Sequence, residues 1–253
     1  MRVAIITATI FNNLDWLRQC HASVMAQTHP CTHILLSDGL IENRLTDFQG
    51  QYIGLAHRHN DSGDTLRALG ACSAFSQGFD AVAWLDDDNW FYPNHIASLV
   101  DLHQKTLAPV CTSNCEVYTL DGLKLGPHVD SDGINAVDAN CYFITREAQD
   151  IASLWAKIPS KLHSAGDFLF FWPELLKSGV RRAHSGRHSL GYRATRSHLY
   201  HMYGVTPPAG IKDSFAIYQQ LKADGFIDSD QKQKIIRGPS MRYTIKPTLH
   251  KSI

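Results

Sequence analysis

The stretch Ala81-Val82-Ala83-Trp84-Leu85-Asp86-Asp87-Asp88 joins five apolar residues directly to three acidic ones. A continuous apolar run of this kind predicts a strand that is buried on both faces at the middle of a sheet. Three adjacent carboxylates repel one another, so their place at the end of such a strand costs stability unless a cation or hydrogen-bond donors compensate. The stretch therefore predicts a central strand of a sheet with an acidic site at its end.

Asp86 and Asp88 are two residues apart, so in an extended segment they share one face while Asp87 points the other way. Mg²⁺ and Mn²⁺ bind carboxylates, and such sites use one or two of them together with substrate phosphates. The Asp-x-Asp pair is therefore a candidate metal site that also holds a diphosphate. The alternative is a solvated acidic turn in which Asn89 serves as a cap.

Strands and helices alternate on either side of this stretch over the first hundred residues. Apolar runs predict strands at 3–6, 33–36 and 52–55, and helical spacing predicts helices at about 14–27, 64–75 and 93–107. This alternation predicts an α/β fold with a mostly parallel central sheet flanked by helices. Ligands of such sheets bind at the carboxyl ends of the strands, where Asp38 and residues 86–88 are expected.

The second half of the chain is less regular. Strands are expected at 110–112, 116–119 and 141–144, helices at 146–158, 168–178 and 212–224, and loops over 184–210, which is rich in His, Arg, Tyr, Gly and Pro. We expect a single domain over 1–253, with a nucleotide-binding half at 1–108, a mixed second half at 109–230 and a basic tail at 231–253.

Composition and charge limit the function classes. The 253 residues are 44% hydrophobic and 19% charged, which is typical of a globular protein. Lys plus Arg and Asp plus Glu number 24 each, so a general nucleic-acid binder is not expected. No apolar run approaches the roughly 18–20 residues of a membrane span, and no signal peptide is recognised, so we expect a cytoplasmic protein. The six cysteines are expected to be buried free thiols.

Residues 84–93, Trp-Leu-Asp-Asp-Asp-Asn-Trp-Phe-Tyr-Pro, resemble the Asp-x-Asp region of GT-A fold glycosyltransferases of family 2. Upstream, Ile5–Thr9 resembles the first strand of that family, Leu17–Thr28 its first helix, Leu36–Gly39 the end of its second strand, and Asn60–Gly70 a segment lining the donor site. These matches cover about residues 3–100 in the right order. Asp38 is followed by Gly39-Leu40-Ile41-Glu42, where the family often has a second Asp, and the Gln-x-x-Arg-Trp motif of processive synthases is absent.

The resemblance implies a GT-A-like, Rossmann-type domain and a metal-dependent inverting transfer of one sugar from a nucleoside-diphosphate sugar. A UDP-sugar is the favoured donor and a GDP-sugar the alternative, and a glycan or a lipid-linked molecule is the expected acceptor. Asp88, with Asp86, would hold Mn²⁺ or Mg²⁺. The residues expected at the nucleotide-sugar are Thr7, Thr9, Asp38, Arg67, Asp86 and Asp87.

An inverting transfer also needs one general base, which takes the proton of the acceptor hydroxyl. The resemblance implies an acid at the start of a helix in the second half, and Asp167 in Ala165–Phe171 is the best match. Its aromatic neighbours would raise its pKa, as a base requires. The alternative role of Asp167 is a helix cap, and Asp130, Asp132 and Asp138 are the other candidate bases.

The second half offers further candidate ligands. GT-A enzymes commonly complete the metal site or diphosphate clamp from a C-terminal loop, and here His198 and His201 have a His-x-x-His spacing. Trp90, just beyond the acids, is the candidate acceptor-binding residue. The basic tail 231–253 could contact anionic lipid at the inner face of a membrane, and its alternative is a solvated terminus.

Two other functions compete with the transferase. A nucleotidyltransferase usually has a Gly-rich, basic loop after its first strand, whereas residues 7–13 contain neither Gly nor a basic residue. A non-catalytic nucleotide- or carbohydrate-binding domain on a GT-A scaffold is the other alternative, because no second acid accompanies Asp167.

Overall fold

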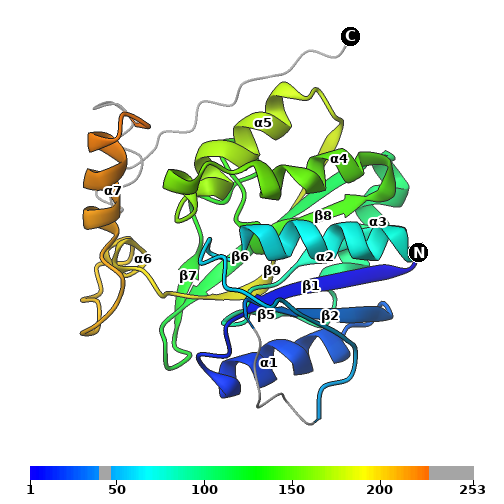
Figure 1. Cartoon of the computed structure of the whole chain (residues 1–253). Helices are drawn as coiled ribbons and strands as arrows, with labels where there is room; N and C mark the ends of the chain where they lie inside the picture. The colour runs from blue at the N-terminus through cyan, green and yellow to red at the C-terminus, as the bar shows by residue number, and fades with distance from the viewer. Residues whose placement is uncertain (40–46, 228–253) are drawn as a thin grey trace. The chain divides into compact units, whose positions relative to one another are not determined.

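The computed structural model describes residues 1–39 and 47–227 (Figure 1). The basic tail at 231–253 lies outside these residues, so its predicted lipid contact stays a prediction. The chain divides into two compact units, Met1–Arg193 and Ala194–Ile253. The strands of the first unit are β1 (Val3–Thr9), β2 (Cys31–Ser37), β3 (Gln51–Gly54), β4 (Ala81–Trp84), β5 (Trp90–Phe91), β6 (Val110–Tyr118), β7 (Lys124–Pro127), β8 (Tyr142–Thr145) and β9 (Arg182–Arg193).

The helices of the first unit lie between these strands. They are α1 (Leu14–Met25), α2 (Asp64–Ser76), α3 (His95–Thr106), α4 (Gln149–Ala152) and α5 (Trp172–Lys177). Short 3₁₀ turns cover Ala139–Cys141, Arg146–Ala148, Ser153–Lys157 and Ser160–Leu162, and a π-helical turn covers Asp167–Phe171. The predicted helix at 146–158 is therefore a series of short turns, and the one at 168–178 begins as a π-helix that leads into α5.

The strands form one mixed sheet. Its order is β3-β2-β1-β4-β8-β6-β9-β5, and β7 pairs with β6. The strands β3, β2, β1 and β4 are parallel to their neighbours, as the alternation predicts. β8 is antiparallel to β4 and β6, whereas β6 and β9 are parallel. β4 therefore lies where the parallel half of the sheet meets the mixed half.

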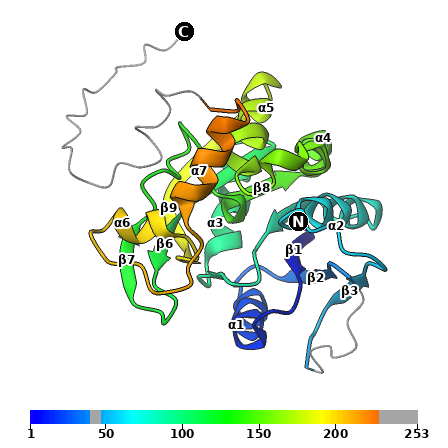
Figure 2. The ribbon, with the colours of Figure 1, turned by 60° about the vertical axis from the view of Figure 1, so that its left-hand side comes forward.

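Helices cover both faces of the parallel half. Figures 1 and 2 show α1 and α2 on opposite sides of β1 and β2, and α4 on the side of α2. Asn13 caps α1, because its side chain accepts hydrogen bonds from the backbone N–H groups of Asp15 and Trp16. α2 lies close to the sheet at Gly70, where a Cβ atom would meet Ile6 Cγ2 at 2.5 Å. Glycine thus lets the helix that begins at the candidate site pack directly on β1.

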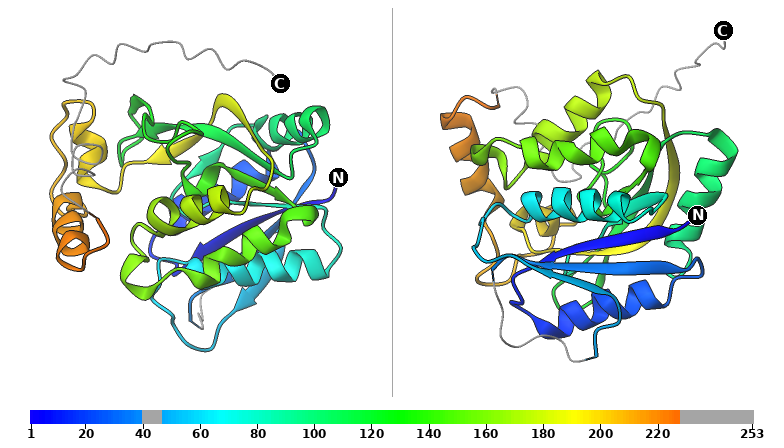
Figure 3. Two further views of the ribbon diagram at one scale, coloured as in Figure 1. Left: turned by 90° about the horizontal axis from the view of Figure 1, so that it is seen from above. Right: turned by 45° about the vertical axis from the view of Figure 1, so that its right-hand side comes forward.

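The core of the first unit runs through the middle strands. All four residues of β4 and of β8 are buried, and Trp84, Trp155, Trp172 and Phe171 are among the largest buried side chains. The predicted core position of Trp84 is therefore confirmed. Figure 3 shows the sheet from above and from one side, with the helices of the first unit on its two faces.

The expectation of loops over 184–210 was wrong for its first part and for Ser197–His201, which form helix α6. Residues 182–193 form β9, which pairs along β6 from Arg182 to Arg193. The polar composition of this strand misled the prediction, because its first half is exposed or only partly buried and needs few apolar residues. The predicted strands at 110–112 and 116–119 form one strand, β6.

The second unit contains α6 (Ser197–His201) and α7 (Ser214–Ala223) among its described residues. The backbone N–H of Ser197 donates to the carbonyl of Lys212, and Tyr218 and Leu221 of α7 are buried. The helix predicted at 212–224 is therefore confirmed. Within the described ranges, no helix is long and apolar enough to cross a bilayer.

The cysteines are free thiols, as expected. Cys20, Cys111, Cys115 and Cys141 are buried and Cys31 is half-buried. Cys72 is exposed on α2, so its predicted burial was wrong. It lies on the helix face that the sheet does not cover.

Candidate active site

The acidic turn at residues 86–89 follows β4 and is held by groups from the second half of the first unit. The backbone N–H of Asp86 donates to Asn140 Oδ1 at 2.6 Å, and that of Arg193 donates to Asn89 Oδ1 at 2.8 Å. Asn89 is buried, and its own N–H donates to the carbonyl of Asp86 at 3.1 Å. The turn is therefore fixed in place by residues 54 and 104 positions further along the chain.

Both carboxylate oxygens of Asp86 have partners. Oδ1 accepts from Arg67 Nη2 at 2.6 Å, and Oδ2 accepts from Asn140 Nδ2 at 3.0 Å. The same amide of Asn140 also donates to Asp138 Oδ1 at 2.7 Å. Asn140 therefore connects Asp86 to a second, buried carboxylate, and burial raises the pKa of Asp138 to about 6.

Asp87 points to β1, away from the partners of Asp86. Its Oδ2 accepts from Thr9 Oγ1 at 2.6 Å, and the hydroxyl oxygen of Thr9 in turn accepts from the N–H of Phe11 at 2.9 Å. Burial raises the pKa of Asp87 to about 6, and the charge of Asp86 adds to this, while the bond from Thr9 opposes it. The bond joins the loop after β1 to the acidic turn.

Asp88 is a carboxylate surrounded by other carboxylates. Burial and the charges of Asp86 and Asp87 raise its pKa well above its ordinary value, and the charge of Arg193 opposes them. The Arg193 guanidinium donates to the backbone carbonyl of Asp88 and, at 2.6 Å, to Gln19 Oε1. A further positive charge at this position would stabilise the ionised form of Asp88.

The donor set of the acidic turn fits a hard divalent cation. Carboxylate oxygens are the ligands that Mg²⁺ and Mn²⁺ prefer, and the mutual repulsion of these acids is relieved by a cation. Among the described residues, no three His, Cys, Asp or Glu side chains converge into a preformed metal cage. The turn therefore fits the kind of site in which one or two carboxylates share the ion with the phosphates of a substrate.

Arg67 links the acidic turn to the first turn of α2. Its Nη1 donates to Asp64 Oδ1 at 3.1 Å and to the carbonyl of Ser62 at 2.9 Å, while Nη2 binds Asp86. The guanidinium lies 4.9 Å from the ring centroid of buried Trp155. Burial alone would lower the pKa of Arg67, but the charges of Asp86 and Asp64 outweigh it and raise that pKa.

Asp64 also binds a histidine from the second half of the first unit. Its Oδ2 accepts from His163 Nδ1 at 2.9 Å, across 99 residues of sequence. Asp64 is buried, and burial raises its pKa to about 6 against the opposing effects of Arg67 and His163. His163 keeps a quarter of its side chain exposed.

Asp38 holds the loop that leads from β3 to α2. Its Oδ1 accepts from the N–H of His59 at 2.7 Å, and its Oδ2 accepts from the N–H of Asn60 at 2.9 Å. Asn60 and Ser62 have positive φ values of 54° and 60°, which few residues other than glycine adopt. Asp38 thus fixes the segment whose Ser62 carbonyl binds Arg67.

The structure brings together most of the predicted nucleotide and metal residues. Thr9, Arg67, Asp86, Asp87 and Asp88 form one connected group, and Asp38 joins it through residues 59–63. Thr7 does not reach this group through its side chain, because it is fully buried and its hydroxyl bonds with His33 Nε2 at 2.8 Å.

The candidate bases differ in how each is linked to this group. Asp167 is half-buried in the π-helical turn, and its charge acts on Arg67. Asp138 binds Asn140 of the group directly. Asp132 accepts from the N–H groups of Ile134 and Asn135 in a turn, and burial raises the pKa of Asp130 to about 6.

The side chain of Trp90 packs against Arg193 and Tyr118. Its ring lies 5.0 Å from the Arg193 guanidinium and 4.8 Å from the ring of Tyr118. Gly191 lies against the same ring, because a Cβ there would meet Trp90 Cε2 at 2.2 Å. Trp90 is half-buried, so only part of its ring is accessible to an acceptor. Its acceptor role stays a prediction.

His198 and His201 belong to the second unit, whereas the acidic turn belongs to the first. His198 Nδ1 bonds with Ser214 Oγ at 2.7 Å, and His201 is exposed. Their role as metal ligands stays a prediction.

Sequence reasoning missed Asn140 and the pair Asp64 and His163. These residues meet their partners across 54 and 99 positions, and nothing in the local sequence marks them. The one available signal was the spacing of Asp64 and Arg67, which are three residues apart at the start of a helix and so share a face.

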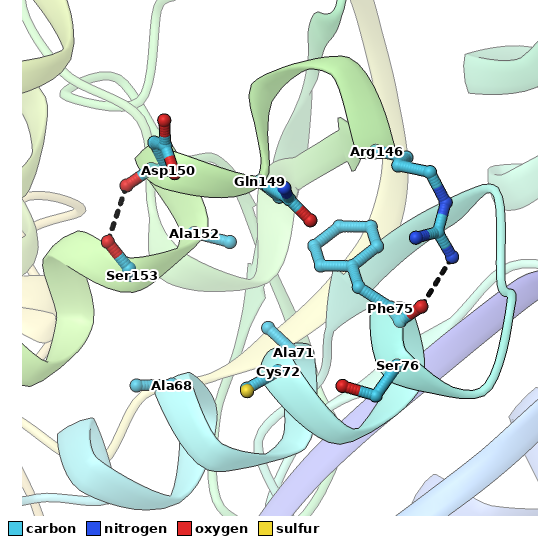
Figure 4. Close-up of a pocket in the computed structure, with 10 residues that line it drawn as sticks. All are labelled: Ala68, Ala71, Cys72, Phe75, Ser76, Arg146, Gln149, Asp150, Ala152 and Ser153. Carbon is cyan, nitrogen blue, oxygen red and sulfur yellow. Dashed lines mark hydrogen bonds between the residues drawn. The ribbon is translucent and has the colours of Figure 1, made fainter.

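A groove lies between α2 and the segment 146–153, apart from the acidic turn (Figure 4). Arg146 closes one end by donating to the carbonyls of Phe75 and Phe79 at 2.5 and 2.7 Å. None of the predicted site residues lines the groove. The ten residues that line it are Ala68, Ala71, Cys72, Phe75, Ser76, Arg146, Gln149, Asp150, Ala152 and Ser153.

Solved structures of TarS from S. aureus have a similar fold. TarS 1-349 matches with a TM-score of 0.58 and 13% identity, covering 93% of this chain and 69% of that chain. Its complex with UDP matches with a TM-score of 0.59 and 11% identity, covering 93% and 70%. Its complex with UDP-GlcNAc matches with a TM-score of 0.59 and 13% identity, covering 76% and 58%. The predicted GT-A-like α/β fold is therefore confirmed.

Sequence comparisons give the family directly. No curated protein sequence matches the chain significantly. The family model described as "Glycosyl transferase family 2" matches residues 5–153, which include most of β1, the loop at 59–63, Arg67 and the acidic turn. The chain therefore belongs to glycosyl transferase family 2 and is a glycosyltransferase.

Proposed function

We propose that the protein is a metal-dependent inverting glycosyltransferase that moves one sugar from a nucleoside-diphosphate sugar to an acceptor hydroxyl. The observation that carries this proposal is the acidic turn after β4, joined to Arg67 through Asp86 at 2.6 Å. A UDP-sugar is the favoured donor, supported by the UDP and UDP-GlcNAc complexes of the similarly folded TarS. A glycan or lipid-linked acceptor is proposed. Family membership sets the nucleotidyltransferase alternative aside.

The proposed metal site consists of Asp88 with Asp86. Bound there, Mn²⁺ or Mg²⁺ would neutralise charge on the diphosphate leaving group. Thr9, Asp38, Arg67 and Asp87 would bind or position the nucleotide-sugar. Asp38 would act on the nucleotide mainly through the loop at 59–63, because both of its carboxylate oxygens already accept backbone N–H groups.

Asp167 is the proposed general base. The acceptor oxygen attacks the anomeric carbon, Asp167 takes the proton of that hydroxyl, and the bond from the anomeric carbon to the diphosphate oxygen breaks with its electrons going to the nucleoside diphosphate. Attack opposite to the leaving group inverts the anomeric centre. Trp90 is proposed to contact the acceptor.

Thermal shift with UDP, GDP, CMP and dTDP, each with and without Mn²⁺, tests the donor site. Binding to the folded protein raises Tm by mass action. We expect one diphosphate to raise Tm only with Mn²⁺, and Asp88→Asn to lose that rise. Asp101→Asn is the matched control, because Asp101 is an exposed acid paired with Lys105 on α3. If no nucleotide shifts the wild-type protein with Mn²⁺, the proposed donor site is wrong.

Turnover separates the base from the binding site. Asp167→Asn should bind the nucleotide as the wild-type protein does, while release of the nucleoside diphosphate from its sugar falls by about 10²–10⁴-fold. Equal turnover of the wild-type protein and Asp167→Asn would show that Asp167 is not the base. Asp138→Asn is then the next variant to test. Binding without any turnover in the wild-type protein would contradict the proposed reaction.

A further inference from the structure

His163 has the arrangement of an oriented histidine. Its Nδ1 donates to Asp64 Oδ2 at 2.9 Å, so Nδ1 carries a proton and Nε2 is the ring atom left to bind another group. Within the part of the chain that the structure describes, Nε2 makes no hydrogen bond. A quarter of the His163 side chain is exposed, whereas Asp64 is almost fully buried.

Asp64 is itself fixed, so the imidazole is held firmly. Its other oxygen binds Arg67 at 3.1 Å, and Arg67 binds Asp86 at 2.6 Å. The segment that carries His163 is also packed closely, because a Cβ at Gly166 would meet Ile158 Cγ2 at 2.6 Å. His163 is therefore connected to the acidic turn through two side chains, each with little freedom to move.

The proposed reaction defines where the transferred sugar must lie. The anomeric carbon of the donor is bonded to the diphosphate, which the acidic turn would bind, and is attacked by the acceptor oxygen, whose proton Asp167 would take. The sugar must therefore lie between the acidic turn and Asp167. His163 precedes Asp167 by four residues and is joined through Asp64 to Arg67, whose pKa the charge of Asp167 also raises. His163 is thus linked to both sides of the expected sugar position, to the acidic turn through Asp64 and Arg67 and to Asp167 through four residues of chain.

We propose that His163 binds the transferred sugar of the donor, with Nε2 accepting a hydrogen bond from a sugar hydroxyl and Asp64 positioning the ring. This inference rests on the proposed function and goes beyond it, because it assigns the sugar-binding contact to a residue other than the metal, nucleotide and base residues. With Nδ1 bonded to Asp64, Nε2 is the one ring nitrogen left to meet a sugar hydroxyl.

Dissociation constants for donors with and without the sugar test the proposal. They are measured by calorimetry with Mn²⁺, using UDP, UDP-glucose and UDP-GlcNAc, and GDP with GDP-mannose. His163→Asn keeps a donor for Asp64 but removes the atom at Nε2. It should bind the nucleoside diphosphate as the wild-type protein does and the matching nucleotide-sugar about 5- to 10-fold more weakly, as expected for one lost hydrogen bond.

Two further variants keep the test independent of folding. His163→Gln places an amide near the position of Nε2 and should recover part of the lost affinity for the nucleotide-sugar. His103→Asn is the matched control, because His103 is also half-buried with Nδ1 bonded within the protein, to the carbonyl of Ala108 at 2.9 Å. Its affinities should equal those of the wild-type protein.

The outcomes distinguish this inference from the proposed function. If His163→Asn weakens binding of UDP or GDP as much as that of the sugar-carrying donor, His163 is not a sugar ligand. If it weakens neither while the wild-type protein binds both, the inference is wrong and the proposed function stands. If the wild-type protein binds none of these nucleotides with Mn²⁺, the proposed function fails and this inference fails with it.

Discussion

Arg67 is the residue on which the described site most depends. It is a buried cation that ion-pairs with Asp64 at 3.1 Å and Asp86 at 2.6 Å, and it lies over the ring of Trp155. Removing one partner of a buried ion pair leaves an uncompensated charge, whereas removing an exposed pair costs little. Here two carboxylates would be left without their cation.

Arg67→Met should therefore lower the free energy of unfolding by about 3–5 kcal/mol near pH 7. Urea denaturation measures this change. Arg18→Met is the control, since Arg18 pairs with Asp15 in an exposed i, i+3 pair and its loss should cost less than about 1 kcal/mol. Equal losses in the two variants would show that Asp64 and Asp86 find other partners.

At the scale of elements, His95 joins helix α3 to strand β9. It lies in the first turn of α3, stacks on Phe91 with ring centroids 3.9 Å apart, and its Nδ1 bonds with Ser189 Oγ at 2.8 Å. Burial lowers the pKa of His95 to about 3 from an ordinary 6.5. Between these two values the unfolded chain binds one more proton than the folded protein, so falling pH favours unfolding.

His95→Asn removes this titration while keeping a polar group near Ser189. Wild-type stability should lose about 1.4 kcal/mol per pH unit through His95 as the pH falls below 6.5, and the variant should not. The difference in stability between the two proteins should therefore shrink between pH 7 and pH 5. Chemical denaturation at several pH values measures it. If the stabilities of the two proteins fall in parallel as the pH is lowered, His95 is protonated in the folded protein or is no longer buried there.

The elements that could be predicted are those with local signals. The helix after Asn13 and the strands up to Trp84 follow from capping and apolar runs, and they are present. β9 could not be predicted, because it is defined by pairing with β6 rather than by its own residues. The same limit applies to the site: the acids after β4 were visible in the sequence, whereas Asn140 and His163 depend on contacts between distant segments.

At the scale of the whole molecule, the balance of charge governs solubility. The chain has 24 basic and 24 acidic residues and a pI of about 7.2. Proteins associate most readily when their net charge is near zero, because repulsion between molecules is then weakest. Burial lowers the pKa of His33, His95 and His128 to about 3, 3 and 4, so these residues stay neutral in mild acid. Below the pI of about 7.2 the chain as a whole gains net positive charge, and above it the chain gains net negative charge.

Solubility should therefore be lowest near pH 7 and rise toward both pH 5.5 and pH 9. Precipitation with polyethylene glycol across this pH range measures it, and adding salt should reduce the difference by screening the charges. A solubility that changes in one direction only across the range would show that a local patch, rather than the net charge, controls association.

The bond between Asp86 and Asn140 also has a consequence for biosynthesis. A nascent chain that has left the ribosome as far as residue 130 contains the whole parallel half of the sheet, yet it lacks β8 and the amide that holds the N–H of Asp86. The edge of β4 is then unpaired, and the acidic turn has no support from the second half. We therefore expect the ability to bind a donor to arise only after β8 has been synthesised and has paired with β4, late in translation of the first unit.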